Sequence, residues 1–148
     1  MMESIMKLES LIAEMTEIVT ATNEVEFNLK LAPDKWSKKE ILGHLCDSAV
    51  NNHIRFVKIL LSDYPIAIQG YAQNDWVRVN DYQDQYDQTE VLSLWQQMNW
   101  MILRVMQKAD SSDFQKKCVL PDKTEVTLEW LFNDYVDHMI HHLEQIEL

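Results

Sequence analysis

The chain has 148 residues and a formal net charge of −11. This length suits one domain with a core of its own, which we expect to span residues 1–148. The acidic balance and the lack of a basic run argue against nucleic acid as a partner. Only two glycines and three prolines interrupt the chain, which favours long helices over many turns.

The cysteines and the hydropathy pattern give an expectation for the compartment. Cys46 and Cys118 lie far apart and form neither a C-x-x-C motif nor a disulfide framework. No apolar stretch approaches the roughly 20 residues that span a membrane. Residues 1–7 lack the basic region and following apolar run of a signal peptide. We therefore expect a cytoplasmic protein with no membrane partner.

The first half of the chain contains two predicted long helices. Apolar residues recur at spacings of three and four at the start of the chain, which predicts an amphipathic helix from about Glu3 to Ala21. Ser37, followed three residues later by Glu40, has the pattern of a capping box. This pattern opens a second helix, which we expect to end near Leu61.

The second predicted helix has apolar residues over a very wide arc, so it should be covered on more than one side. We expect a homodimer, because exposed apolar surface of that extent often marks an interface. Its remaining strip consists of Ile41, His44, Asp47, Ser48, Asn51 and Arg55. This strip fits either a solvated face or the wall of a polar pocket, and periodicity alone slightly favours the solvated face for His44.

A polar connection of about 27 residues, 62–88, follows. Connections of this length are unusual in a compact domain and are often functional. We expect one short helix in it, near Ala72 to Val79. Its reach suits a crossover along the whole bundle, which would leave the second and third long helices parallel.

The second half of the chain contains two more predicted long helices with a hairpin between them. Thr89 is the predicted cap of the third helix, which should end near Ala109. Two short β-prone runs flank residues 121–124 and predict a small β-hairpin. Thr127 is the predicted cap of the last helix, which runs to the C-terminus. Four long helices around one core predict an all-α four-helix bundle.

The last predicted helix carries three of the five histidines within five residues. His138 and His142 lie one turn apart on the same face, at the border between apolar and polar sides. Two histidines at this spacing can hold one metal ion. They also fit two ordinary histidines with hydrogen bonds, and the spacing alone leaves both interpretations open. His141 lies further towards the polar side and is a reserve ligand.

Three segments resemble the DinB/YfiT-like family. Residues 36–48, with Asn51 and residues 54–56, resemble the second helix of that family, and residues 135–142 resemble its last helix. Residues 120–125 resemble the hairpin before it. The resemblance covers most of the chain in order. It implies a four-helix bundle with up-down-down-up topology, which agrees with the long crossover between the second and third helices.

The resemblance also implies a metal site with one histidine from the second helix and two from the last. Carried onto this sequence, these ligands are His44, His138 and His142, which replaces the solvated interpretation of His44. The implied cofactor is a divalent metal ion, zinc or nickel. Gly43 stands where close relatives often carry a second histidine, so the surroundings of the site should differ from theirs.

Two aspartates are candidate catalytic residues beside these ligands. Asp134, one turn before His138, could orient an imidazole from outside the ligand set. Asp47, three residues after His44, could do the same or accept a proton. For each aspartate the alternative interpretation is a solvated surface carboxylate.

The resemblance implies several functions for such a site. We expect first a metal-dependent S-transferase that joins a low-molecular-weight thiol, such as bacillithiol or mycothiol, to an electrophile. The alternatives are a metal-dependent hydrolase that activates water and a non-catalytic metal-binding dimeric bundle. Three neutral imidazoles leave the charge of the ion uncompensated and a position open. The sequence offers no convincing fourth ligand, which favours a reactive site over a closed structural one.

Overall fold

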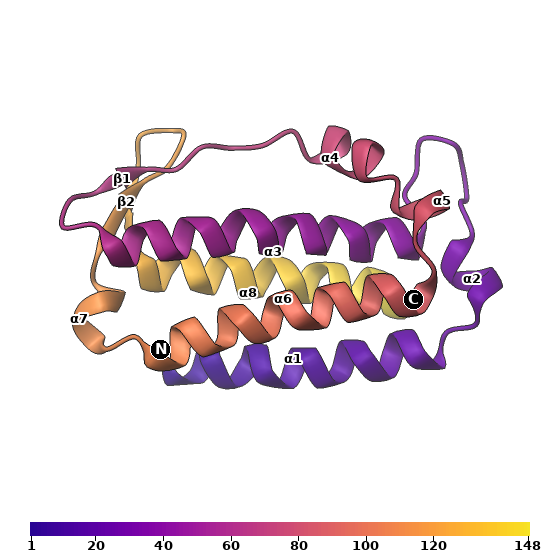
Figure 1. The fold of residues 1–148 in the computed structure, drawn as a ribbon, viewed down its shortest axis with the longest axis horizontal. Coiled ribbons are helices and arrows are strands. Elements are labelled where there is room, and N and C mark those ends of the chain that lie inside the picture. Colours follow the sequence, from indigo (N-terminus) through magenta and orange to yellow (C-terminus); the bar gives the residue numbers. More distant parts are fainter.

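Four long helices lie side by side along the long axis of the computed structural model, which describes residues 1–148 (Figure 1). They are α1 (Met2–Ala21), α3 (Lys38–Leu61), α6 (Gln88–Lys108) and α8 (Leu128–Glu147). In Figure 1, α1 and α8 run in one direction and α3 and α6 in the other. The predicted all-α four-helix bundle with up-down-down-up topology is therefore confirmed.

Local capping chemistry fixes where the helices start. The Ser37 hydroxyl accepts a hydrogen bond from the backbone N–H of Glu40, and the Glu40 carboxylate accepts one from the backbone N–H of Ser37. This is the predicted capping box of α3. For α6 the prediction of Thr89 as the cap is wrong, because Asp87 caps this helix and a second capping box forms with Glu90.

The crossover between α3 and α6 returns along the full length of the bundle (Figure 1). It contains the strand β1 (Ile66–Ala67) and the short helices α4 (Gln73–Asn80) and α5 (Tyr82–Gln85). Helix α4 lies within one residue of the predicted short helix, whereas β1 and α5 were not predicted. Because the crossover starts and ends at opposite ends of the bundle, α3 and α6 are parallel, as predicted.

A small three-stranded sheet holds the start of this crossover through hydrogen bonds between strands. The predicted hairpin is present as β2 (Lys117–Val119) and β3 (Glu125–Thr127), which pair antiparallel, and β1 pairs in parallel with β2. The Thr127 hydroxyl then caps α8 by accepting from the backbone N–H of Trp130, as predicted. Two further short helices occur in the connections, α2 (Glu24–Asn28) and α7 (Ser111–Phe114).

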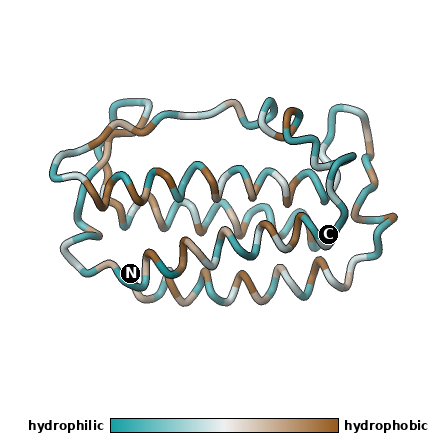
Figure 2. Tube along the Cα trace, in the orientation of Figure 1, coloured by the Kyte–Doolittle hydropathy of each residue, from teal (hydrophilic) through white to brown (hydrophobic).

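The apolar core lies between the four long helices, and Figure 2 shows apolar residues recurring along each of them. Each large apolar side chain that is fully buried stabilises the fold by about 1.5–3 kcal/mol relative to exposure. The outer side of α3 is covered by buried Val77 of α4 and Tyr82 of α5. Among the large apolar side chains of α3, only Ile54 and Leu61 remain exposed.

The wide apolar arc of α3 is thus covered largely within one chain. This removes the sequence argument for a second copy on that face, and the homodimer stays a prediction. No helix in the structure is both long enough and apolar enough to cross a membrane.

Candidate metal centre

Three histidine side chains meet where α3 packs against α8. Nε2 of His138 lies 3.4 Å from Nε2 of His44 and 3.0 Å from Nε2 of His142. Two nitrogens bound to one zinc ion at 2.0–2.1 Å, with tetrahedral angles, lie about 3.3–3.4 Å apart. These two separations are close to those that a shared ion requires, and the ligand nitrogens of all three histidines lie within 4.8 Å of one another, so the group could hold a metal ion.

Helix spacing and packing bring these rings together. His138 and His142 are four residues apart on α8, so both point towards α3. His44 is buried, with only 1% of its surface exposed, and its ring packs against that of Trp36 with centroids 4.9 Å apart. His141 lies outside the cluster of three and is exposed.

Hydrogen bonding at the far side of His142 favours metal binding. Its Nδ1 lies 2.8 Å from Oε1 of Gln145, which can only accept a hydrogen bond. The proton of His142 therefore resides on Nδ1, and the lone pair of Nε2 points into the cluster. Gln145 was not identified from the sequence, although its position three residues after His142 on one helix is a usable signal.

All three imidazoles are neutral at pH 7, the form that binds a metal. Burial, with the neighbouring His142 and His138, lowers the pKa of His44 to about 3. Burial, with the neighbouring His142 and His141, lowers the pKa of His138 to about 4. Burial is also the main cause that lowers the pKa of His142.

The two predicted aspartates make no hydrogen bond to these histidines. Oδ1 of Asp47 accepts hydrogen bonds from the Tyr82 hydroxyl at 2.6 Å and from Nδ2 of Asn80 at 2.8 Å. Its Oδ2 is buried without a partner, and burial raises the pKa of Asp47 to about 6. Asp134 is exposed on α8. The predicted orienting contact to an imidazole is therefore absent for both residues.

Gly43 allows the crossover to approach α3 closely. A Cβ atom at this position would overlap the ring of Tyr82. The Tyr82 ring thus fills the space that a side chain at position 43 would need. The same approach brings the Tyr82 hydroxyl onto Asp47, so the glycine also determines the partner of this carboxylate.

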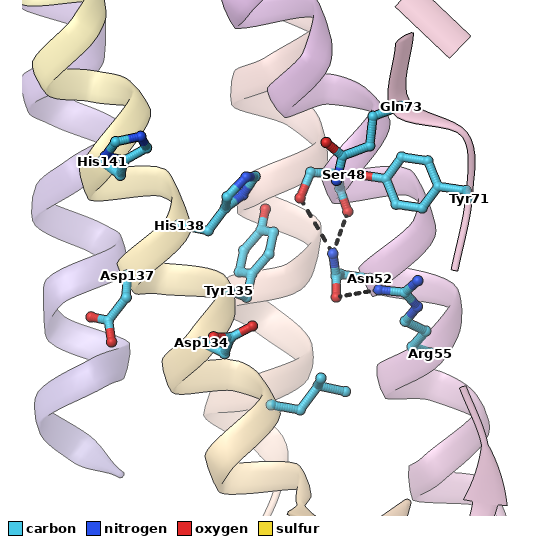
Figure 3. A pocket seen from close by; sticks show the side chains of 11 residues that line it. Ser48, Asn52, Arg55, Tyr71, Gln73, Asp134, Tyr135, Asp137, His138 and His141 are labelled. Carbon is cyan, nitrogen blue, oxygen red and sulfur yellow. Dashed lines mark hydrogen bonds between the residues drawn. The ribbon is translucent and has the colours of Figure 1, made fainter. Parts of the chain in front are cut away.

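A polar pocket of about 460 Å³ opens beside the histidines (Figure 3). His138 and His141 line it from α8, Ser48, Asn52 and Arg55 from α3, and Tyr71 and Gln73 from the crossover. Of the polar strip of α3, Ser48 and Arg55 line this pocket, which agrees with the second of the two interpretations for these two residues. Tyr71 and Gln73 were not predicted as site residues, because nothing in their local sequence links them to α3.

Comparison with known proteins supports the same fold. A family model described as the DinB superfamily matches residues 7–146. YfiT of Bacillus subtilis is 27% identical over 140 residues, covering 94% of this chain and 78% of that protein. A relative from Halalkalibacterium halodurans is 20% identical over 143 residues, covering 97% and 82% of the two chains. Both relatives are provisionally named metal-dependent hydrolases.

Two solved structures have the same architecture. The structure of Bacillus subtilis YfiT, described as a probable metal-dependent hydrolase with an unusual four-helix bundle topology, superposes with a TM-score of 0.85 at 26% identity. The match covers 97% of this chain and 82% of that one. A mycothiol-dependent maleylpyruvate isomerase superposes with a TM-score of 0.74 at 10% identity, over 95% of this chain and 58% of that one. This second likeness shows the fold alone.

Proposed function

Because the chain belongs to the DinB superfamily, we propose that it is a metal-dependent enzyme that joins a low-molecular-weight thiol to an electrophile. The metal ligands in this proposal are His44, His138 and His142. The observation that carries it is the convergence of three neutral imidazoles beside a polar pocket. No fourth histidine, cysteine or carboxylate joins the cluster, which leaves a coordination position for a reactant.

A divalent ion such as zinc or nickel, when bound there, would supply Lewis acidity that lowers the pKa of a nearby thiol from its usual value of about 8.5. The residues of the chain hold and orient the reactants around it. Gln145 fixes the tautomer of His142, and Trp36 packs on His44, so both rings are held before a ligand arrives. Such prior orientation lowers the entropic cost of bringing two reactants together.

Asp47 is the proposed proton acceptor. Its Oδ2 has no hydrogen-bond partner, and burial holds the pKa of the carboxyl at about 6, near the working pH that suits a general base. Tyr82 and Asn80 both donate to Oδ1, which leaves Oδ2 as the atom that takes the proton.

Two comparisons bear on the choice between a thiol and water as the nucleophile. The mycothiol-dependent isomerase has the same bundle and is named for its dependence on a thiol. This likeness in fold is its only support for a thiol as the nucleophile. The hydrolase name of the relatives at 27% and 20% identity favours water. A hydrolase would use the same three histidines and the same pocket, and it is the alternative function.

The experiment that separates these functions measures turnover of an electrophile, chlorodinitrobenzene, by metal-loaded and chelator-treated protein, with and without a panel of small thiols. Turnover that requires both metal and thiol is expected. The same protein samples are also assayed on ester and amide substrates, and metal-dependent turnover of these that proceeds equally well without thiol would contradict the transferase and support the hydrolase. Tight metal binding without either activity would support a non-catalytic bundle.

A further inference from the structure

We propose that Arg55 binds a carboxylate of the molecule that reacts at the three histidines, so that one reactant is an organic acid. This inference rests on the proposed function, because that function places the reaction at the three histidines. It goes beyond that function because it assigns a chemical class to the reactant and a binding role to a residue outside the cluster.

Arg55 has unused hydrogen-bonding capacity. It is the only lysine or arginine that lines the pocket. Nη2 donates to the backbone oxygen of Gln69 at 2.6 Å, and Nη1 donates weakly to Oδ1 of Asn52 at 3.3 Å. A guanidinium has five N–H donors, so about three remain without a protein partner. No carboxylate lies within salt-bridge distance of Arg55, although the chain has 24 acidic residues against 13 basic ones.

The guanidinium is held in place before a ligand binds. Nδ2 of buried Asn52 donates to the backbone oxygen of Ser48 at 2.8 Å, which fixes the amide that contacts Arg55. The Tyr71 ring lies on another side of the guanidinium, with its centroid 5.7 Å from Cζ. A planar guanidinium with a fixed orientation suits bidentate binding of a carboxylate.

The position of Arg55 connects it to the histidines. One face of α3 carries His44, Ser48, Asn52 and Arg55. Arg55 lies 11 positions after His44, which corresponds to about 16 Å along the helix axis. Figure 3 shows Ser48, Asn52 and Arg55 descending one side of the pocket, opposite His138, Tyr135 and Asp134. A pocket of about 460 Å³ holds a small molecule that reaches from the histidines to Arg55.

Negative charges on the opposite wall of the pocket limit which acids can bind at Arg55. Asp134 and Asp137 line the pocket from α8, and both are exposed. Water screens their repulsion of an anion at Arg55, but they disfavour further negative charge on the α8 side. The pocket therefore suits a compound with one carboxylate at the Arg55 end better than a polyanion such as a nucleotide.

The test measures, by calorimetry, the binding of four matched compounds to the zinc-loaded protein: mercaptohexanoate with a terminal thiol, its amide, hexanoate and hexanamide. The acid-to-amide affinity ratio reports on Arg55, and the effect of the thiol reports on the proposed function. Arg55→Gln and Arg55→Met both keep the aliphatic stem and remove the charge. Arg55→Lys keeps the charge, and Arg104→Gln, on the exposed face of α6, is the matched control.

In the wild type the acid should bind at least about tenfold more tightly than its amide, as expected for a charge-assisted pair. This ratio should fall to near one in Arg55→Gln and Arg55→Met, persist in part in Arg55→Lys, and stay unchanged in Arg104→Gln. A purely structural role of Arg55 would weaken acid and amide alike. A ratio unaltered by both neutral variants, or no binding of either acid to the wild type, overturns the proposal. A thiol group that adds no affinity contradicts the proposed function alone.

Discussion

Two polar clusters interrupt the apolar packing of α8, and they differ in how their hydrogen bonds are used. In the first, the buried Tyr135 hydroxyl donates to Oδ1 of Asn99 at 2.5 Å, and Nδ2 of Asn99 donates to the backbone oxygen of Trp95 at 2.9 Å. The bonds in this cluster run from one protein group to the next and end on the backbone. Such a network stabilises one arrangement of the helices and calls for no ligand.

The second cluster begins only three residues later, at His138. Its ring nitrogens converge on one another, and the buried Nδ1 of His44 has no hydrogen-bond partner. The Nε2 atoms of these three imidazoles make hydrogen-bond contacts only with one another. This difference shows that the burial of polar groups does not by itself mark a ligand-binding site. Ring nitrogens that converge on one another without another protein partner are a better marker of a ligand site.

The largest effect should come from removing a ligand of the second cluster. His44→Ala, His138→Ala and His142→Ala should each weaken metal binding by at least about 100-fold, more than the loss of a supporting residue outside the ligand set usually costs. Elemental analysis and chelator competition measure this. His53→Ala, on α3 outside the cluster, and His141→Ala should keep the metal. Full metal retention in all three ligand variants would remove the site.

The first cluster should respond in stability and not in metal content. Tyr135→Phe leaves Oδ1 of Asn99 buried without its donor, which should cost about 1–3 kcal/mol of unfolding free energy. Urea unfolding of the metal-free protein measures the loss, and Tyr64→Phe, whose side chain is exposed, is the control. An unchanged midpoint in Tyr135→Phe, or a loss of metal from it, would break the distinction between the two clusters.

The long helices could be predicted because their signals are local. Apolar periodicity and the Ser37–Glu40 box define α3 without any long-range information. The predicted cap of α6, Thr89, lies two residues after the observed cap, although Asp87 and Glu90 have the spacing of a capping box. The pairing of β1 with β2 joins segments about 50 residues apart, and two residues of strand carry no pattern that predicts such a partner.

The site could be predicted only in part for the same reason. The spacing of His138 and His142 is visible along one helix, whereas His44 lies on a strip whose pattern also fits a solvated face. Its inclusion depended on the resemblance to a family. The pocket residues Tyr71 and Gln73 come from the crossover, whose path over α3 is set by tertiary packing.

The smallest predicted effect concerns Asp47, a polar group that belongs fully to neither cluster. Its folded-state pKa of about 6 lies above the ordinary value of 3.8, so the unfolded chain ionises first. Stability is therefore lost as the pH rises from 3.8 through 6, and the cost is absent below that window. Asp47→Asn does not titrate, so it should gain stability relative to the wild type across this range.

This gain should be about 1 kcal/mol by neutral pH, after allowance for solvent screening. Urea unfolding of both metal-free proteins at several pH values measures it, and the contributions of the histidines cancel in the difference. A difference that is independent of pH would mean that burial does not raise the pKa of Asp47 in the folded protein.

The contact between Gly43 and Tyr82 limits which substitutions this sequence can accept at position 43. A side chain at position 43 would overlap the tyrosine ring at position 82, so a change at Gly43 requires that Tyr82 change first or at the same time. Gly43→His alone should displace the crossover, whereas Gly43→His combined with Tyr82→Ala makes room for the new ring. Because Tyr82 also holds Asp47, an exchange at this pair would change the environment of that carboxylate without altering any of the three histidines.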